Sequence, residues 1–129
     1  MSLLPKFSAL LLGIALAAPA IAQPIQPFST AALKAAQAKG QSVLVDAYAS
    51  WCPICRKQEP IINALSKDRA FDKLLILRLD YDNQNAEKRE LGIVQQSTLI
   101  AFDGGKETGR MVGVTDAEQI KALAKSALP

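Results

Sequence analysis

The chain has 129 residues, half of them hydrophobic, and a formal net charge of +3. This length and composition fit one globular domain, and they exclude a disordered chain or a long coiled coil. Acidic and basic residues are interleaved without a basic run and only 5% of the residues are aromatic, so nucleic acid is not expected as a partner.

The N-terminal 22 residues have the pattern of a secretory signal peptide. Lys6 precedes an apolar stretch at residues 7–18, and the small-residue triplet Ala-Ile-Ala follows at residues 20–22. The apolar stretch is shorter than the roughly 20 residues that a membrane-spanning helix needs. We therefore expect cleavage after Ala22, a mature domain at residues 23–129, and a periplasmic location if the source is a Gram-negative bacterium.

The first half of the mature chain alternates between extended and helical patterns. Residues 23–28 contain two prolines and are expected to form at most a short edge strand. Ser29 or Thr30 is expected to cap a helix that ends at Gly40. The apolar, β-branched run at residues 42–49 predicts a buried central strand.

A longer helix is predicted at residues 52–68. Pro53 suits its first turn, whereas Pro60 lies inside it and should bend it. Its apolar face is expected to consist of Ile54, Ile61, Ile62 and Leu65. Residues 73–82 then predict a second central strand.

The last third predicts a short helix, a β-hairpin and a final helix. Residues 85–91 are polar and end at Gly92. Strands at residues 97–103 and 107–114 are joined through two consecutive glycines, which is a hairpin signal. The final helix, residues 115–128, is expected to begin with a capping box of Thr115 and Glu118. Its buried face is expected to comprise Ile120, Leu123, Ala124 and Ala127. The alternation predicts an α/β sandwich around a mixed sheet.

The only two cysteines, Cys52 and Cys55, follow the only tryptophan in the sequence SWCPIC. A disulfide across so short a loop would stabilise the fold by only about 2 kcal/mol. Structural zinc needs four cysteine or histidine ligands, and this chain has two cysteines and no histidine. Cys52 lies between a predicted strand and a predicted helix, where the N-terminal amides and the helix dipole favour a thiolate. Cys55 lies one turn further on, where it could attack a mixed disulfide on Cys52, so a redox role is favoured.

The stretch VLVDAYASWCPICRKQEP resembles the thioredoxin family in its apolar strand, aspartate, W-C-x-x-C and helix proline. The resemblance extends over residues 28–128. It implies a three-layer sandwich with a central mixed sheet of four to five strands and about four helices. It also implies a thiol–disulfide oxidoreductase without a cofactor, in which Cys52 and Cys55 alternate between dithiol and disulfide.

The same resemblance implies roles for further residues and partners. Asp46 matches a buried acid beneath the cysteine pair that exchanges a proton with Cys55, and Trp51 would cover the site and shape its docking face. The implied partners are protein disulfides and a membrane-bound electron donor, and the chain is expected to be a monomer.

One position departs from the family pattern. The family has a cis-proline facing the cysteine pair, where this chain has Ser97. Because a non-proline cis bond costs about 3 kcal/mol, the Gln96–Ser97 bond is expected to be trans. The resemblance implies that the backbone of Gln96 pairs with an extended substrate segment. The hydroxyl or N–H of Ser97 could hydrogen-bond the Cys52 thiolate, although a neutral replacement is an equal alternative.

Other functions remain compatible with the sequence. Two cysteines without the facing proline could bind Cu(I), or share an iron–sulfur cluster between two chains. The pair could also serve a disulfide oxidase or isomerase. The absence of histidine between the cysteines, where strong oxidants of the family often have one, favours a reductase.

Overall fold

The computed structural model describes residues 2–3, 13–17 and 23–129. Lys6 and the Ala-Ile-Ala triplet of the predicted signal peptide lie outside these residues. In chain order the elements are β1 Gln26–Pro27, α1 Thr30–Ala38, β2 Ser42–Tyr48, α2 Pro53–Lys67, a 3-10 turn Arg69–Phe71, β3 Leu74–Asp80, α3 Asn85–Leu91, β4 Thr98–Asp103, β5 Lys106–Val112 and α4 Ala117–Ser126. No helix in the described ranges is both long enough and apolar enough to cross a membrane.

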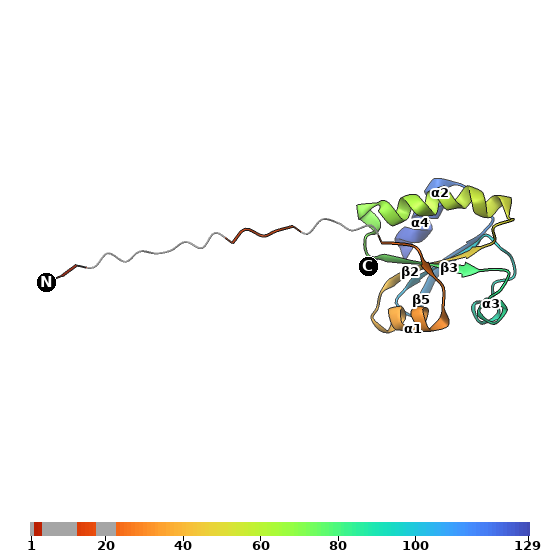
Figure 1. Ribbon diagram of the computed structural model, residues 1–129, viewed down its shortest axis with the longest axis horizontal. Helices are drawn as coiled ribbons and strands as arrows, with labels where there is room; N and C mark the ends of the chain where they lie inside the picture. The colour runs from red at the N-terminus through yellow and green to blue at the C-terminus, as the bar shows by residue number, and fades with distance from the viewer. Residues whose placement is uncertain (1, 4–12, 18–22) are drawn as a thin grey trace.

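The five strands form one mixed sheet in the order β1-β3-β2-β4-β5. β3 runs parallel to both β1 and β2, whereas β4 is antiparallel to β2 and β5. Figure 1 shows α2 and α4 covering one face of the sheet and α1 and α3 covering the other. The predicted α/β sandwich with a mixed sheet is therefore confirmed.

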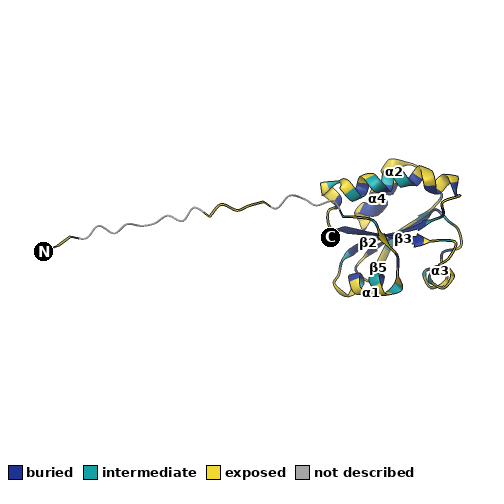
Figure 2. Ribbon diagram, in the orientation of Figure 1, coloured by how far each residue is buried: buried dark blue, intermediate teal, exposed yellow. Residues whose placement is uncertain are grey.

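The two faces of the sheet form two separate hydrophobic clusters. Val43, Val45 and Ala47 of β2 pack with α1, whereas Leu44 of the same strand packs under α2 and α4. This alternation follows from the two-residue period of a strand. β2 is buried on both faces, as Figure 2 shows for the centre of the sheet. Because β2 ends shortly before Cys52, its packing on both faces fixes the position of the cysteine segment.

Of the predicted N-terminal helix caps, the one at α1 is confirmed and the one at α4 is wrong. Ser29 caps α1 by accepting a hydrogen bond from the N–H of Ala32. The capping box predicted at Thr115 is wrong, because the carboxylate of Asp116 accepts the N–H of Gln119 at 2.8 Å and so caps α4. An ionised acceptor at a helix N-terminus also gains from the helix dipole, which a threonine hydroxyl does not.

The apolar faces of the helices are largely as predicted. Ile120, Leu123, Ala124 and Ala127 are all buried beneath α4. On α2, Ile62 and Leu65 are buried, but Ile54, in the first turn of the helix, is 39% exposed. α2 continues through Pro60 as one helix.

Candidate active site

Cys52 and Cys55 lie where β2 gives way to α2. Cys52 is the N-cap of α2, and its Sγ accepts a hydrogen bond from the N–H of Cys55 at 3.1 Å. Pro53 occupies the first helical turn, where its missing N–H costs nothing. Both cysteines are free thiols and both are buried. The structure thus brings the two sulfurs to the helix N-terminus that the sequence predicts.

The Cys55 thiol faces the end of β2. Its Sγ lies 3.8 Å from the carbonyl oxygen of Ala47, in donor geometry. Burial and the neighbouring Cys52 sulfur raise the pKa of the Cys55 thiol to about 11, although the backbone N–H groups of Ala49 and Ser97 act in the opposite direction. Cys55 therefore holds its proton at neutral pH, and it needs a base before it can act as a nucleophile.

This state of Cys55 can be measured directly. In a pH titration of the reduced protein followed by ultraviolet thiolate absorbance, we expect the Cys55 signal to appear only as the pH approaches about 11. The signal is isolated by subtracting the titration of a Cys55→Ser variant from that of the parent. A difference signal with its midpoint near that of an ordinary exposed thiol would contradict the assignment.

Asp46 is buried in β2, one residue before the Ala47 carbonyl that Cys55 contacts. Only 1% of its surface is exposed, and its Oδ2 pairs with Arg78 Nε at 3.0 Å. Desolvation raises the pKa of Asp46 above its usual value, against the lowering effect of Arg78, and the nearby Glu59 raises it further. Its Oδ1 has no hydrogen-bond partner among the described residues.

Arg78, which the sequence analysis missed, links Asp46 to the surface. Its Nη1 pairs with Glu59 at 3.4 Å, and its guanidinium carbon lies 4.5 Å from the centre of the Tyr48 ring. The sequence signal that could have found Arg78 is a charged residue within an otherwise apolar strand. In the structure, parallel pairing of β2 with β3 sets Arg78 opposite Asp46. The two residues are 32 positions apart in the sequence, so local sequence patterns do not indicate that they are in contact.

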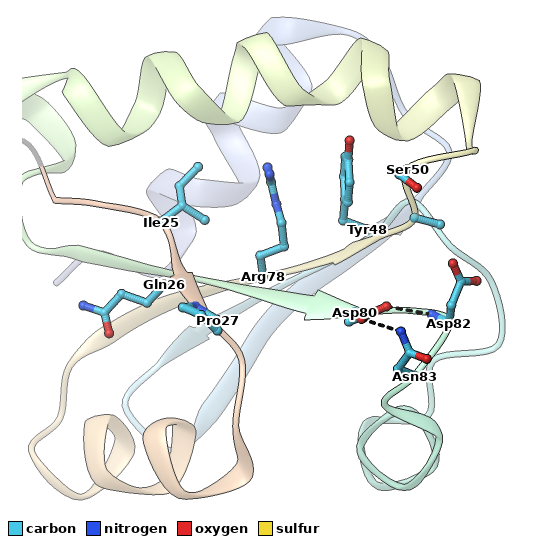
Figure 3. Close-up of a pocket in the computed structure, with 10 residues that line it drawn as sticks. Ile25, Gln26, Pro27, Tyr48, Ser50, Arg78, Asp80, Asp82 and Asn83 are labelled. Carbon is cyan, nitrogen blue, oxygen red and sulfur yellow. Dashed lines mark hydrogen bonds between the residues drawn. The ribbon is translucent and has the colours of Figure 1, made fainter.

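A pocket of about 460 Å³ opens beside this cluster. Figure 3 shows Arg78 and Tyr48 pointing toward α2, whereas Asp80, Asp82 and Asn83 lie around the end of β3. The Arg78 side chain is 24% exposed. Arg78 is therefore the member of the buried ion pair that water reaches.

Trp51 lies on the surface beside the cysteines. It is 57% exposed, and its Nε1 lies 3.0 Å from each oxygen of the Asp82 carboxylate. Asp82 follows β3, so this contact ties the cysteine segment to the neighbouring strand. The indole is thus exposed and held in one orientation, and its role in docking stays a prediction.

Ser97 lies across from the cysteines in the turn before β4. It is buried, and its N–H donates to the Ala47 carbonyl at 2.9 Å. Its φ is +62°, the left-handed region that glycine favours, and the Gln96–Ser97 bond is trans, as predicted. Its hydroxyl donates to the carbonyl of Gln96. The residue Gln96 is half-buried. The hydrogen bond from Ser97 to Cys52 is not formed, because the left-handed turn directs the N–H to Ala47 instead.

Within the described residues, no group of three or more histidine, cysteine, aspartate or glutamate side chains could hold a metal ion. The chemistry available at this site is that of two thiols, one of them at a helix N-terminus, with a buried carboxyl group one residue before the carbonyl that the Cys55 thiol contacts.

Comparison with known proteins agrees with this chemistry. The family model for thioredoxin matches residues 25–126. A thioredoxin of Alicyclobacillus acidocaldarius is 34% identical over 80 residues, covering 62% of this chain and 75% of the relative. A thioredoxin of Chlamydia muridarum is 36% identical over 81 residues, covering 63% and 78%.

Solved structures show the same relationship. The crystal structure of Trxlp from Edwardsiella tarda matches with a TM-score of 0.74 and 38% identity, covering 78% of this chain and 98% of that chain. Malassezia sympodialis thioredoxin matches with a TM-score of 0.71 and 27% identity, covering 81% and 93%. The chain belongs to the thioredoxin family, as a protein-disulfide reductase that works by thiol–disulfide exchange through its cysteine pair.

Proposed function

We propose that this protein is exported to the periplasm, where it reduces disulfides in other exported proteins. The observation that carries the proposal is the signal-peptide pattern of residues 1–22, which lies directly before the thioredoxin match at residues 25–126. In an oxidising compartment disulfides persist, so a reductase there has protein substrates.

In the proposed reaction Cys52 attacks and Cys55 resolves. The Cys52 thiolate attacks a substrate disulfide, forms a mixed disulfide and releases one substrate thiol. Cys55 then loses its proton and attacks the Cys52 sulfur, which releases the second substrate thiol and closes the Cys52–Cys55 disulfide. The substrate gains two electrons, and the protein loses them. The helix N-terminus at Cys52 and the 3.1 Å contact of its sulfur with the Cys55 N–H support this order.

Asp46 is proposed to accept the proton of Cys55. Burial raises the pKa of Asp46, which makes its carboxylate a stronger base than an exposed aspartate. The Ala47 carbonyl, one residue further along β2, contacts the Cys55 thiol. The proton would then leave on the side of Arg78, where the pocket opens to water.

Substrate segments are proposed to bind between Trp51 and Gln96. Trp51 offers an exposed apolar ring held by Asp82. An extended segment could pair with the backbone at Gln96, in the manner of a strand added to a sheet edge. A membrane-bound thiol–disulfide relay is the proposed electron donor, because it would return two electrons to the Cys52–Cys55 disulfide outside the cytoplasm.

Export is tested by expressing the full chain in a Gram-negative host and sequencing the N-terminus of the protein in the periplasmic fraction. We expect a mature protein that begins at Gln23. An Ala22→Phe variant should remain uncleaved, because a bulky side chain does not fit the small-residue cleavage site. Parent protein that stays in the cytoplasm with its N-terminus intact would disprove export.

The direction of electron flow is tested by equilibrating the mature protein with glutathione. We expect a reduction potential near or below about −270 mV, the value typical of thioredoxin. A potential near about −120 mV, typical of strong periplasmic oxidants, would identify a disulfide oxidase instead.

A further inference from the structure

Gln58 is a polar side chain in the centre of the protein. It is 0% exposed, and it lies on α2 three residues after Cys55. Its Nε2 donates to the carbonyl of Ser97 at 3.2 Å and to the carbonyl of Val114 at 2.9 Å. One amide therefore joins the helix of the cysteines to two loops that are distant in the sequence.

The loop that Gln58 holds is the one facing Cys55. The carbonyl of Ser97 also accepts the N–H of Gly113 at 3.1 Å, and the N–H of Ser97 donates to the Ala47 carbonyl. That same Ala47 carbonyl lies 3.8 Å from the Cys55 sulfur. The N–H of Ser97 and the thiol of Cys55 thus converge on one oxygen atom.

Ser97 needs external support in this conformation. A left-handed backbone is strained for a residue with a side chain, because Cβ comes close to the following carbonyl oxygen, and Ser97 has a φ of +62°. Such a conformation persists only where the surroundings hold it. The hydrogen bond from Gln58 reaches the carbonyl of Ser97, the group whose orientation is set by this backbone rotation.

We infer that Gln58 is a positioning residue for the reaction, which holds the left-handed turn at Ser97 so that the Ser97 N–H stays beside Cys55. When Cys55 becomes a thiolate, that N–H can donate to its sulfur as well as to Ala47. The inference rests on the resolving role of Cys55 proposed above. It does not depend on the compartment in which the protein works.

A role in packing alone does not explain a glutamine at this position. The Oε1 of Gln58 is buried with no hydrogen-bond partner among the described residues, which costs free energy. Leucine has a similar size and would pack there, and Ser97 would keep its bond from Gly113, but the carbonyl of Val114 would lose the bond from Gln58 Nε2. A buried polar group with an unpaired oxygen, one helical turn after Cys55, points to a role in the reaction. The lowering effect of the Ser97 N–H on the pKa of Cys55 supports this.

The test uses the reaction of the reduced protein with the small aromatic disulfide DTNB, which separates attack from resolution. Cys52 attacks the reagent, forms a mixed disulfide and releases one coloured thiolate. Cys55 then attacks the Cys52 sulfur and releases the second thiolate, so the second release reports resolution alone. The two releases account for both electrons that the protein gives up.

For Gln58→Leu we expect an unchanged first release and a second release about tenfold slower, because small misplacements of reacting groups have effects of this size. The slowing should shrink as the pH rises toward the pKa of Cys55, where the thiolate forms without help. Gln58→Met is the second variant if leucine prevents folding, and we expect the same result. Ile62→Leu is the control, because it alters a fully buried side chain of α2 in the core under α4, and both of its releases should match the parent.

A second release equal to that of the parent in a folded Gln58 variant would overturn the inference. This outcome is separate from the failure of the proposed function. A parent that resolves DTNB normally but does not reduce protein disulfides would disprove the proposed substrates and leave the role of Gln58 standing.

Discussion

Replacing Asp46 with asparagine is expected to slow the resolution step at neutral pH by roughly a hundredfold, the lower end of what a positioned general acid or base contributes. Cys55 holds its proton with a pKa of about 11, so without a carboxylate nearby few molecules carry the resolving thiolate. The measurement is the second thiolate release from DTNB as a function of pH, in the parent and in Asp46→Asn.

The same substitution should stabilise the protein at neutral pH, since burial penalises the Asp46 carboxylate by more than its attraction to Arg78 compensates. Desolvation raises the pKa of Asp46 in the folded state, so the folded protein binds this proton more tightly than the unfolded chain does. Stability from this group is therefore present below its unfolded pKa and is lost as the pH rises through the folded pKa. The gain from Asp46→Asn should be seen at neutral pH and should shrink in acid.

Denaturant unfolding of the reduced protein at neutral and at acidic pH checks this expectation. Asp103→Asn is the matched control, because Asp103 also lies in a strand but is exposed. That variant should change neither stability nor the second release. An Asp46→Asn protein that resolves as fast as the parent would show that Asp46 does not act on Cys55. Arg78 remains paired with Glu59 in the variant, which keeps its charge from being stranded.

Substitutions at Ser97 are expected to act in opposite directions. Ser97→Gly should raise the free energy of unfolding by about 1 kcal/mol, because glycine adopts a φ of +62° without a clash. Ser97→Pro should lower it by about 3 kcal/mol or more. Proline fixes φ near about −65° and has no N–H to donate to Ala47.

Denaturant midpoints of the reduced proteins decide between these expectations. Ser50→Gly is the control for the glycine variant, since Ser50 is exposed and has no positive φ. It should show no gain, because glycine there only adds freedom to the unfolded chain. A Ser97→Pro protein as stable as the parent would mean that the loop rebuilds around the proline. In that case the replacement of a family proline by Ser97 would be a neutral change, the alternative that the sequence left open.

Local sequence patterns sufficed for most of the secondary structure. The alternation of buried strands and amphipathic helices predicted the sandwich, and the consecutive glycines predicted the turn between β4 and β5, where Gly104 has a φ of +56°. These features depend on residues a few positions apart, whose spacing is fixed by the period of a helix or strand. A local pattern predicts less well where two neighbouring residues could both cap a helix. At α4 the cap is Asp116 and not Thr115.

The cysteine pair was also predictable, because its geometry is local. Two residues separate Cys52 from Cys55, and a helix that begins between them places the first sulfur at the N-cap. The surroundings of the pair were not predictable in the same way. Arg78 reaches Asp46 across 32 residues, and Gln58 reaches Ser97 across 39. Nothing in the spacing of these residues indicates that they touch.

The sequence by itself thus determined the order of the elements, the position of the thiols and the family to which the chain is related. The tertiary structure decided which groups surround the thiols. Parallel pairing of β2 with β3 sets Arg78 beside Asp46, and antiparallel pairing of β2 with β4 brings the turn at Ser97 to the Ala47 carbonyl. These contacts exist only when the strands are packed side by side, because side chains and carbonyl groups far apart in the chain acquire partners through sheet order and register.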